Sequence, residues 1–466
     1  MRFYEVTLLI LELIVLVIIQ GNKHLNRRKR FIITLSLLAL FILHLLFENL
    51  RWQMVGSYYL LVVLIINLFY KIKTNWLKKF VFIINILMII LSFLLIFIFR
   101  ANHLIKPNGS YQVGTLTYEL IDDNRKEIYG SNHEIARKIK VQAWYPSDET
   151  NGKKSKWIGD GKFVADQLAN YARIPKFLLT YITNFDSNSY ENTKLTDKID
   201  KLPVVIISHG WSSFRSIHTD FAEMLASNGF LVLAIDHTYG AMGTVFEDGS
   251  QVAIDLNALP DSKSLKSNYE FLQYANTLVN TYYLDSKLVL DNISKLNDGE
   301  SNIKKFISRI DTDKIGVLGH STGGGGLSKL AITDDRIKSI IGLDPWVEPI
   351  QSEIVTKGLK IPSLFFRSQQ WSKGPNNINL KKIFENSSNN LDVYQIKGSI
   401  HQDFTMLYLF NPIGKYLGLS GNVENDLNRE VQLTSILNFF NKTLKGKNIN
   451  YNNILGDYDI VAKIIF

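Results

Sequence analysis

The sequence predicts an open, mostly parallel, doubly wound α/β sheet of about eight strands, preceded by a unit of four apolar helices. From about Ser110 onward, short β-rich runs alternate with longer amphipathic stretches. This order builds a parallel sheet with helices on both faces. Several of the β-rich runs are apolar throughout, as parallel strands buried on both faces are. The first hundred residues contain four long apolar stretches instead.

The apolar stretches cover residues 4–20, 31–47, 54–70 and 80–99. Each approaches the ~20 residues that a helix needs to cross ~30 Å of hydrocarbon, so residues 1–104 are predicted to be a transmembrane unit. Glu12 in the first stretch, together with the lack of a small-residue cleavage site, argues against a signal peptide. Glu12 and His44 are interpreted as tolerated polar residues that face other helices or the headgroups.

Basic loops predict the orientation of this unit. Residues 21–30 contain five Lys and Arg residues and residues 71–79 contain four, whereas the loop between the second and third stretches has only Arg51. Because Lys and Arg are retained on the cytoplasmic side, the N-terminus and everything after Phe99 should lie outside the cell. The expected location is therefore a multi-pass cell membrane with an extracytoplasmic domain. The richness in Lys, Ile and Asn suits a bacterial origin.

The net charge of +9 comes from the N-terminal unit. Residues 1–106 hold 13 basic and 3 acidic residues, whereas the remainder holds 39 and 40. A nucleic-acid surface would need its basic excess on the folded body, so nucleic acid is excluded as a partner. The chain has no cysteine, which rules out disulfides and thiolate metal sites.

Eight strands are expected in the second domain, residues 105–466. Two long cap-like inserts, about 150–200 and 245–300, interrupt the alternation, and the first is apolar and aromatic enough to cover a site. In such a sheet, ligands bind at the carboxyl ends of the strands. The predicted strands are 111–120, 136–145, 203–209, 229–236, 314–319, 338–344, 362–368 and 391–397.

The run GHSTGGGG contains Gly319, Ser321 and Gly323 in a G-x-S-x-G pattern between a predicted strand and a predicted helix. In a nucleophile elbow the serine occupies a strained turn, and small residues two positions before and after it make that turn possible. The helix that follows directs N–H groups toward a nearby anion. A phosphate-binding P-loop is excluded, because no Gly-Lys-Ser/Thr follows at the required spacing. Ser321 is therefore the candidate nucleophile.

A nucleophilic serine needs a base and an orienting acid, which follow it in the order acid, then histidine. His401 is the only histidine after Ser321, in a loop that follows a predicted strand. Asp344 ends the buried run KSIIGLD, where an unpaired carboxylate would be costly. The loop after residues 362–368, where many hydrolases place the acid, has no carboxylate. Asp344 is the candidate acid, and Asp403 is a less favoured stand-in.

Two N–H donors are needed to stabilise the oxyanion of an acyl-transfer reaction. One candidate is the amide of Thr322, directly after the serine. The other is the amide of Trp211, in the glycine turn SHGWS that follows residues 203–209. Asp236 and His237 end the next strand and are interpreted as residues that brace loops.

With these residues assembled, the chain resembles the type II (plasma-type) platelet-activating factor acetylhydrolase family of α/β-hydrolases over roughly residues 111–442. The resemblance rests on SHGWSSFRS, ASNGFLVLAIDH, GHSTGGGG, IIGLDPW, PSLFFRSQQW and GSIHQDF. It implies Ser321 as nucleophile, Asp344 as acid, His401 as base, and the Trp211 and Thr322 amides as oxyanion donors. It also implies calcium-independent cleavage of short or oxidised sn-2 acyl groups of phospholipids. The run GHSTGGGG is also similar to cutinase-like polyester hydrolases, which place the acid one strand later.

The main expectation is a membrane-anchored serine esterase that acts on a lipid, a phospholipid or a small ester and needs no cofactor or metal. An acyltransferase with the same triad, acting on a cell-surface acceptor, is one alternative, and its acylated product would distinguish it. A non-catalytic sensor or binding module is another, which would turn over no short p-nitrophenyl ester. Acyl-chain preference, oligomeric state and protein partners are left open by the sequence.

Overall fold

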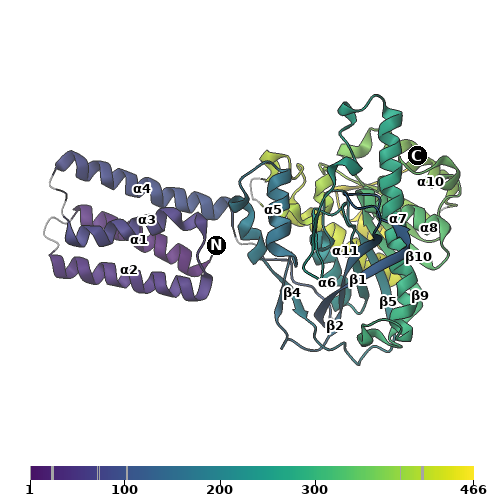
Figure 1. Cartoon of the computed structure of the whole chain (residues 1–466), viewed down its shortest axis with the longest axis horizontal. Helices are drawn as coiled ribbons and strands as arrows, with labels where there is room; N and C mark the ends of the chain where they lie inside the picture. The colour runs from purple at the N-terminus through teal and green to yellow at the C-terminus, as the bar shows by residue number, and fades with distance from the viewer. Residues whose placement is uncertain are drawn as a thin grey trace. The chain divides into compact units, whose positions relative to one another are not determined.

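The computed structural model describes residues 2–21, 26–70, 72, 74–100, 103–388, 390–410 and 414–466. The chain divides into two compact units. One comprises residues 1–102 with 409–413, and the other comprises residues 103–408 with 414–466. In Figure 1 the purple part of the chain is helical, and the mixed α/β part runs from teal to yellow.

The first unit is a bundle of four helices, α1 (Phe3–Gly21), α2 (Arg27–Glu48), α3 (Val55–Phe69) and α4 (Asn75–Ile98), with a 3₁₀ turn at Trp52–Met54. Helices therefore form over all four predicted stretches. Three segments, Arg27–Glu48, Trp52–Phe69 and Asn75–Ile98, are long and apolar enough to cross a membrane. Large apolar side chains also cover the outer faces of the helices, which is typical of helices surrounded by lipid. They include Phe31, Ile42, Val62, Phe80 and Leu94.

Two polar residues of these helices, Glu12 and His44, face inward. Glu12 is fully buried and accepts a hydrogen bond from the Ser57 hydroxyl at 2.9 Å. His44 is also buried and contacts Glu48 at 3.1 Å and the Tyr58 hydroxyl at 2.8 Å. Both therefore contact polar groups of neighbouring segments, or of their own helix, inside the bundle. Part of the two basic loops, residues 22–25, 71 and 73, lies outside the described residues.

The second unit is built on a mixed eleven-stranded sheet of order β13-β12-β11-β10-β9-β5-β6-β2-β1-β4-β3. The six strands from β12 to β6 are parallel neighbours. Strand β2 pairs antiparallel with both β6 and β1. The strands of the sheet are β1 (Gln112–Lys126), β2 (Ala136–Ser147), β3 (Lys154–Lys156), β4 (Asp186–Glu191), β5 (Leu202–Ser208), β6 (Leu231–Asp236), β9 (Ile310–His320), β10 (Ile337–Leu343), β11 (Ser363–Ser368), β12 (Leu391–Ile396) and β13 (Val461–Ile464).

Helices cover both faces of this sheet (Figure 1). On one face the core includes side chains of α7 (Asn268–Asp298), α8 (Ser321–Thr333), α9 (Ser352–Val355) and α10 (Asn376–Asn386). On the other face it includes side chains of α6 (Thr219–Ser227), α11 (Asn425–Thr443) and α12 (Tyr451–Gly456). The central strands β5 and β6 are buried along their whole length, which explains their continuous apolar sequence.

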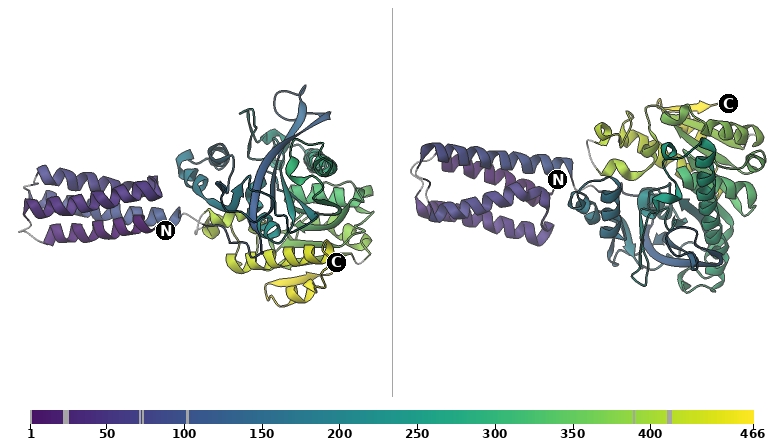
Figure 2. Two further views of the ribbon diagram at one scale, coloured as in Figure 1. Left: turned by 90° about the horizontal axis from the view of Figure 1, so that it is seen from below. Right: turned by 45° about the horizontal axis from the view of Figure 1, so that its top comes forward.

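The prediction of about eight strands was too low. All eight predicted segments form strands, but the sheet also contains β3, β4 and β13. These three are edge or near-edge strands with the sequences KSK, DSNSYE and VAKI, in which no long apolar run marks a strand. The C-terminal strand β13 lies at the edge of the sheet (Figure 2). A separate hairpin joins β7 (Gly243–Val245) and β8 (Gln251–Ala253), and α5 (Gly161–Tyr171) lies between β3 and β4 in the chain.

Candidate active site

Ser321 lies at the junction of β9 and α8, at the carboxyl end of a central strand. Its φ is 54°, in the left-handed region that residues with side chains rarely adopt. Such strained residues are concentrated at functional sites. The Ser321 carbonyl accepts a hydrogen bond from the Trp346 amide at 2.8 Å, which helps to fix the turn.

The two elbow glycines are required by close backbone contacts. A Cβ at Gly323 would lie 2.3 Å from the Ser208 carbonyl oxygen and 2.5 Å from that of His209. A Cβ at Gly319 would lie 2.7 Å from the Gly323 carbonyl oxygen. The first turn of α8 is therefore pressed against the end of β5, and only glycine fits at these positions.

Asp344 and His401 are brought together at the same edge of the sheet. Asp344 follows β10 and is buried, and its Oδ2 lies 3.0 Å from His401 Nδ1. Its Oδ1 accepts a hydrogen bond from the Ser368 amide at 2.7 Å. Because a carboxylate only accepts hydrogen bonds, Nδ1 of His401 must carry the proton in this pair. The other ring nitrogen, Nε2, is then available as a base.

Ser321 and His401 are connected through His320. The His320 and His401 rings lie 4.5 Å apart between centroids, and His320 Nε2 lies 3.1 Å from the His401 carbonyl oxygen. Burial holds the pKa of His320 well below its ordinary value, so its ring is neutral and donates this hydrogen bond from Nε2. Among the described residues, the Ser321 hydroxyl forms no direct hydrogen bond with His401. Catalytic hydrogen bonds are often long before substrate binds.

The proposed oxyanion loop lies against the serine. A Cβ at Gly210 would be 2.8 Å from the Ser321 Cβ and 3.4 Å from its hydroxyl oxygen. Trp211 is the next residue of this loop and is partly buried. Thr322 is the second residue of α8 and is buried. Both candidate amides therefore belong to segments that adjoin the Ser321 hydroxyl.

The segment Ser368–Trp371, which begins at the last residue of β11, contributes contacts that the sequence reasoning missed. Trp371 stacks on the imidazole of His401, with ring centroids 4.2 Å apart and an interplanar angle of 5°. The Gln370 side chain accepts a hydrogen bond from the His401 amide at 2.8 Å. The Ser368 hydroxyl donates to Asp344 Oδ2 at 2.5 Å. This segment therefore holds both Asp344 and His401, although it carries no charge.

The stand-in acid Asp403 and the loop residue Asp236 both have structural partners. Asp403 accepts hydrogen bonds from the amides of Ile400 and Gly421 at 2.8 and 3.0 Å, and thereby closes the turn around His401. Asp236 accepts a hydrogen bond from the Arg215 amide at 2.6 Å and also contacts the guanidinium group of Arg215. This contact agrees with its interpretation as a residue that braces a loop. Within the described ranges, no group of three His, Asp or Glu side chains could hold a metal ion.

The chain is similar to several ester-cleaving proteins. It is 27% identical over 350 residues to "Platelet-activating factor acetylhydrolase" of Canis lupus familiaris, covering 72% of this chain and 74% of the relative. It is 29% identical over 142 residues to "Cutinase est1" of Thermobifida alba, covering 30% of this chain and 34% of the relative. The structure of a ferulic acid esterase from Streptomyces cinnamoneus superposes with a TM-score of 0.64 at 21% identity. The match covers 78% of this chain and 100% of that one.

The structural match shows that the mixed sheet with helices on both faces is a fold found in an esterase, consistent with an α/β-hydrolase fold. The family model described as platelet-activating factor acetylhydrolase, isoform II, matches residues 97–460, which is most of the chain. The match includes Ser321, Asp344 and His401 and excludes most of the helical bundle. The chain therefore belongs to the isoform II family of platelet-activating factor acetylhydrolases.

Proposed function

We propose that the protein is a membrane-anchored serine ester hydrolase that cleaves short acyl groups from lipid or phospholipid esters. One observation carries the proposal: the 3.0 Å contact between Asp344 and His401 beside a serine held at a left-handed φ. A carboxylate, an imidazole and a hydroxyl in this chain order are the elements of a nucleophilic triad.

In the proposed reaction the Ser321 hydroxyl attacks the acyl carbon while His401 Nε2 takes its proton. Asp344 stabilises the imidazolium ion that forms, because its negatively charged carboxylate accepts a hydrogen bond from the Nδ1–H group. The amides of Trp211 and Thr322 donate hydrogen bonds to the oxyanion. His401 then returns the proton to the leaving alcohol, and water attacks the acyl-enzyme to release the acid and restore Ser321.

The substrate class is inferred from the relatives and from the helical bundle. The dog relative is named an acetylhydrolase, and the other two are named a cutinase and an esterase. All three names describe proteins that cleave esters, and the acetyl group named for the dog relative is a short acyl group. A catalytic domain tethered to a bilayer meets lipid substrates at a high effective concentration, which favours a lipid ester.

Membrane anchoring is supported by the three long apolar helices and by the inward-facing contacts of α1. Arg51 Nη1 lies 3.1 Å from both carboxylate oxygens of Glu5, and Glu12 contacts Ser57. Pairing of this kind makes carboxylates tolerable in a helix within the membrane. We therefore propose α1 as a fourth span, with the N-terminus and the catalytic domain on the extracytoplasmic side.

A fluorophosphonate probe and an ester panel test the catalytic proposal. The wild-type protein in detergent should be labelled and should hydrolyse p-nitrophenyl acetate faster than long-chain esters. Ser321→Ala should be neither labelled by the probe nor able to hydrolyse the ester. The control Ser264→Ala, at an exposed position far along the chain, should retain both. Equal labelling of wild type and Ser321→Ala would refute Ser321 as the nucleophile, and transfer of the acyl group to a surface acceptor would identify a transferase.

The absence of cysteine allows a clean test of orientation. Ser264→Cys introduces one thiol in the catalytic unit, and Asn26→Cys introduces one in the first basic loop; both positions are exposed. In intact cells a membrane-impermeant maleimide should label Ser264→Cys, and it should label Asn26→Cys only after permeabilisation. The reverse pattern would place the catalytic unit in the cytoplasm.

A further inference from the structure

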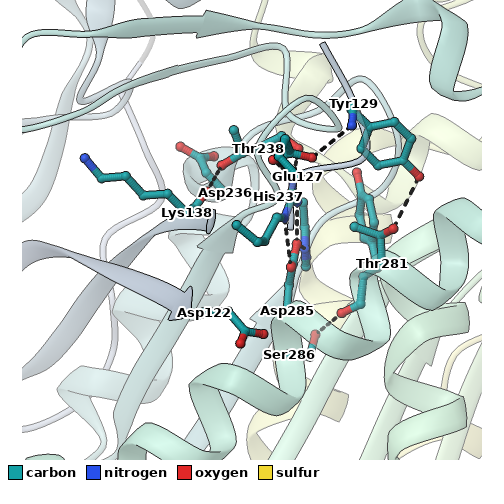
Figure 3. Close-up of polar contacts among 12 residues, drawn as sticks. Asp122, Glu127, Tyr129, Lys138, Asp236, His237, Thr238, Thr281, Asp285 and Ser286 are labelled. Atoms are coloured by element: carbon teal, nitrogen blue, oxygen red, sulfur yellow. Dashed lines mark hydrogen bonds and ion pairs between the residues drawn. The ribbon is translucent and has the colours of Figure 1, made fainter. Parts of the chain in front are cut away.

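A second row of hydroxyl, imidazole and carboxylate lies beneath the candidate active site. The Ser208 hydroxyl lies 2.8 Å from His237 Nε2, and His237 Nδ1 lies 3.0 Å from Asp285 Oδ2. Ser208 ends β5, His237 follows β6, and Asp285 belongs to α7. Figure 3 shows His237 and Asp285 close together, within the group of residues that dashed lines connect.

This second row cannot be a second reaction centre. All three side chains are fully buried. A Cβ at Gly323 would lie only 2.5 Å from the Ser208 hydroxyl oxygen, so the first turn of α8 covers that oxygen directly. No ester could approach it. The row must therefore act through the structure around it.

The charges of the row are fixed. Burial alone would raise the pKa of Asp285, but the guanidinium of Arg137, 2.7 Å away, outweighs burial and holds it well below its usual range. Burial lowers the pKa of His237 to about 4. His237 is thus neutral at physiological pH, donates its Nδ1 proton to Asp285 and accepts the Ser208 proton at Nε2.

From His237 the contacts lead to the oxyanion loop. The His237 carbonyl accepts a hydrogen bond from the Gly240 amide at 2.7 Å, and the Gly240 carbonyl accepts one from the Ser212 amide at 3.1 Å. Ser208 and Ser212 therefore form the two ends of the loop that contains Trp211. The loop that contains Trp211 and the loop that follows His237 each contain a strained residue. Ser212 in the first has a φ of 56°, and Tyr239 in the second has a φ of 64°. Strain of this kind persists only where neighbouring contacts enforce it.

We infer that His237, held between Asp285 and Ser208, is a positioning residue that sets the Trp211 amide at the distance required for oxyanion binding. The inference rests on the proposed function of Ser321. It assigns a role in transition-state stabilisation to a buried network that touches no substrate. Its effect should appear in the acyl-transfer step and not in ground-state binding, because the oxyanion exists only in the transition state and the intermediate.

The test compares Ser208→Ala and His237→Asn with the control Ser286→Ala in the full chain. Ser286 adjoins Asp285 on α7 and is equally buried, but among the residues that the structure describes its hydroxyl bonds only to the Tyr282 carbonyl of the same helix, at 2.7 Å. For each variant, kcat and KM for p-nitrophenyl acetate are measured together with the inhibition constant of a trifluoromethyl ketone. This ketone forms a tetrahedral adduct with the serine and therefore reports on the oxyanion hole.

Ser208→Ala should lower kcat about 10-fold and His237→Asn roughly 30-fold, less than the loss of a whole oxyanion donor. KM should stay within about twofold of the wild-type value, and the inhibition constant should rise in proportion to the loss in kcat. The double variant should be no worse than His237→Asn alone, because both changes remove the same hydrogen bond. Ser286→Ala should lower the melting temperature about as much as Ser208→Ala does. It should leave kcat, KM and the inhibition constant unchanged.

Wild-type kcat and ketone binding in Ser208→Ala, which changes the shape of the core very little, would overturn the inference even if His237→Asn fails to fold. An equal kinetic loss in Ser286→Ala would also overturn it, because it would indicate a general effect of a weakened core. Failure of the proposed function is a separate outcome, since it would appear as hydrolysis by Ser321→Ala.

Discussion

Replacement of Asp344 by Asn should remove most of the activity while leaving the fold intact. In the wild-type chain the Ser368 amide donates a hydrogen bond to Asp344 Oδ1 at 2.7 Å. Asn has the same side-chain volume as Asp, and its oxygen can still accept this hydrogen bond. Its NH₂ group would then face His401 Nδ1, 3.0 Å from Oδ2. Two donors cannot share that contact, so the imidazole would move its proton to Nε2.

An imidazole protonated at Nε2 cannot accept the proton of the Ser321 hydroxyl. The corresponding Asp-to-Asn change in a serine protease triad lowers kcat by about 10⁴-fold for this reason. At 1.36 kcal/mol per factor of ten, this is about 5.5 kcal/mol of lost transition-state stabilisation. We expect a loss of this order in kcat for Asp344→Asn, with little change in KM.

The assay is hydrolysis of p-nitrophenyl acetate by the full chain, with the melting temperature as a measure of folding. Asp403→Asn is the matched control, because Asp403 is also buried and close to His401 but bonds to backbone amides. Asp403→Asn should lower the melting temperature and should reduce kcat only a few-fold. More than a tenth of wild-type activity in Asp344→Asn, or a larger loss in Asp403→Asn, would refute the assignment of the acid.

Three further predictions concern the surroundings of the triad. Trp371→Leu should lower kcat about 10-fold with KM unchanged, because His401 loses the ring that stacks on it; Trp371→Phe should restore most of this loss, and equal activity in the two variants would contradict a stacking role. Gly323→Ala should abolish activity or folding, because the added Cβ would lie 2.3 Å from a backbone oxygen. In the control Gly374→Ala the added Cβ would meet no neighbouring atom within 4 Å, so activity and stability should both be unchanged. The pKa of Asp160 is lowered to about 2, because its Arg and Lys neighbours outweigh the opposing effect of burial. This group therefore adds stability above pH 3.8 that is lost as the pH falls toward 2, and Asp160→Asn should lower the unfolding free energy by about 2 kcal/mol more at pH 7 than at pH 2. An equal deficit at both pH values would contradict the charge pairing.

The central part of the fold was predictable because burial on both faces leaves a mark on the sequence. Strands β5, β6, β9, β10 and β11 contain runs of Val, Ile, Leu and Phe, and each was predicted within a few residues. The edge strands leave no such mark. Strand β4 has the sequence DSNSYE, and its pairing with β1 depends on backbone hydrogen bonds that any sequence can form.

The candidate site was predictable to the extent that chain order and strand ends restrict it. The order of serine, acid and histidine left His401 as the only choice of base, and the structure brings it to Asp344. Trp371 and Gln370 were missed because an uncharged loop carries no signal of what its side chains will touch. The role of His237 was only partly visible, since its contact with Asp285 joins residues 48 positions apart.

The contact between Ser368 and Asp344 has a consequence for how a triad can change over evolutionary time. The carboxyl ends of β10 and β11 are neighbours, and the side chains at 344 and 368 already meet at 2.5 Å. An acidic residue at position 368 in place of the one at position 344 would therefore put the carboxylate only a short distance from its present place beside the imidazole. Hydrolases that differ in which strand bears the acid need not have separate origins, because two substitutions across one hydrogen bond would interconvert them.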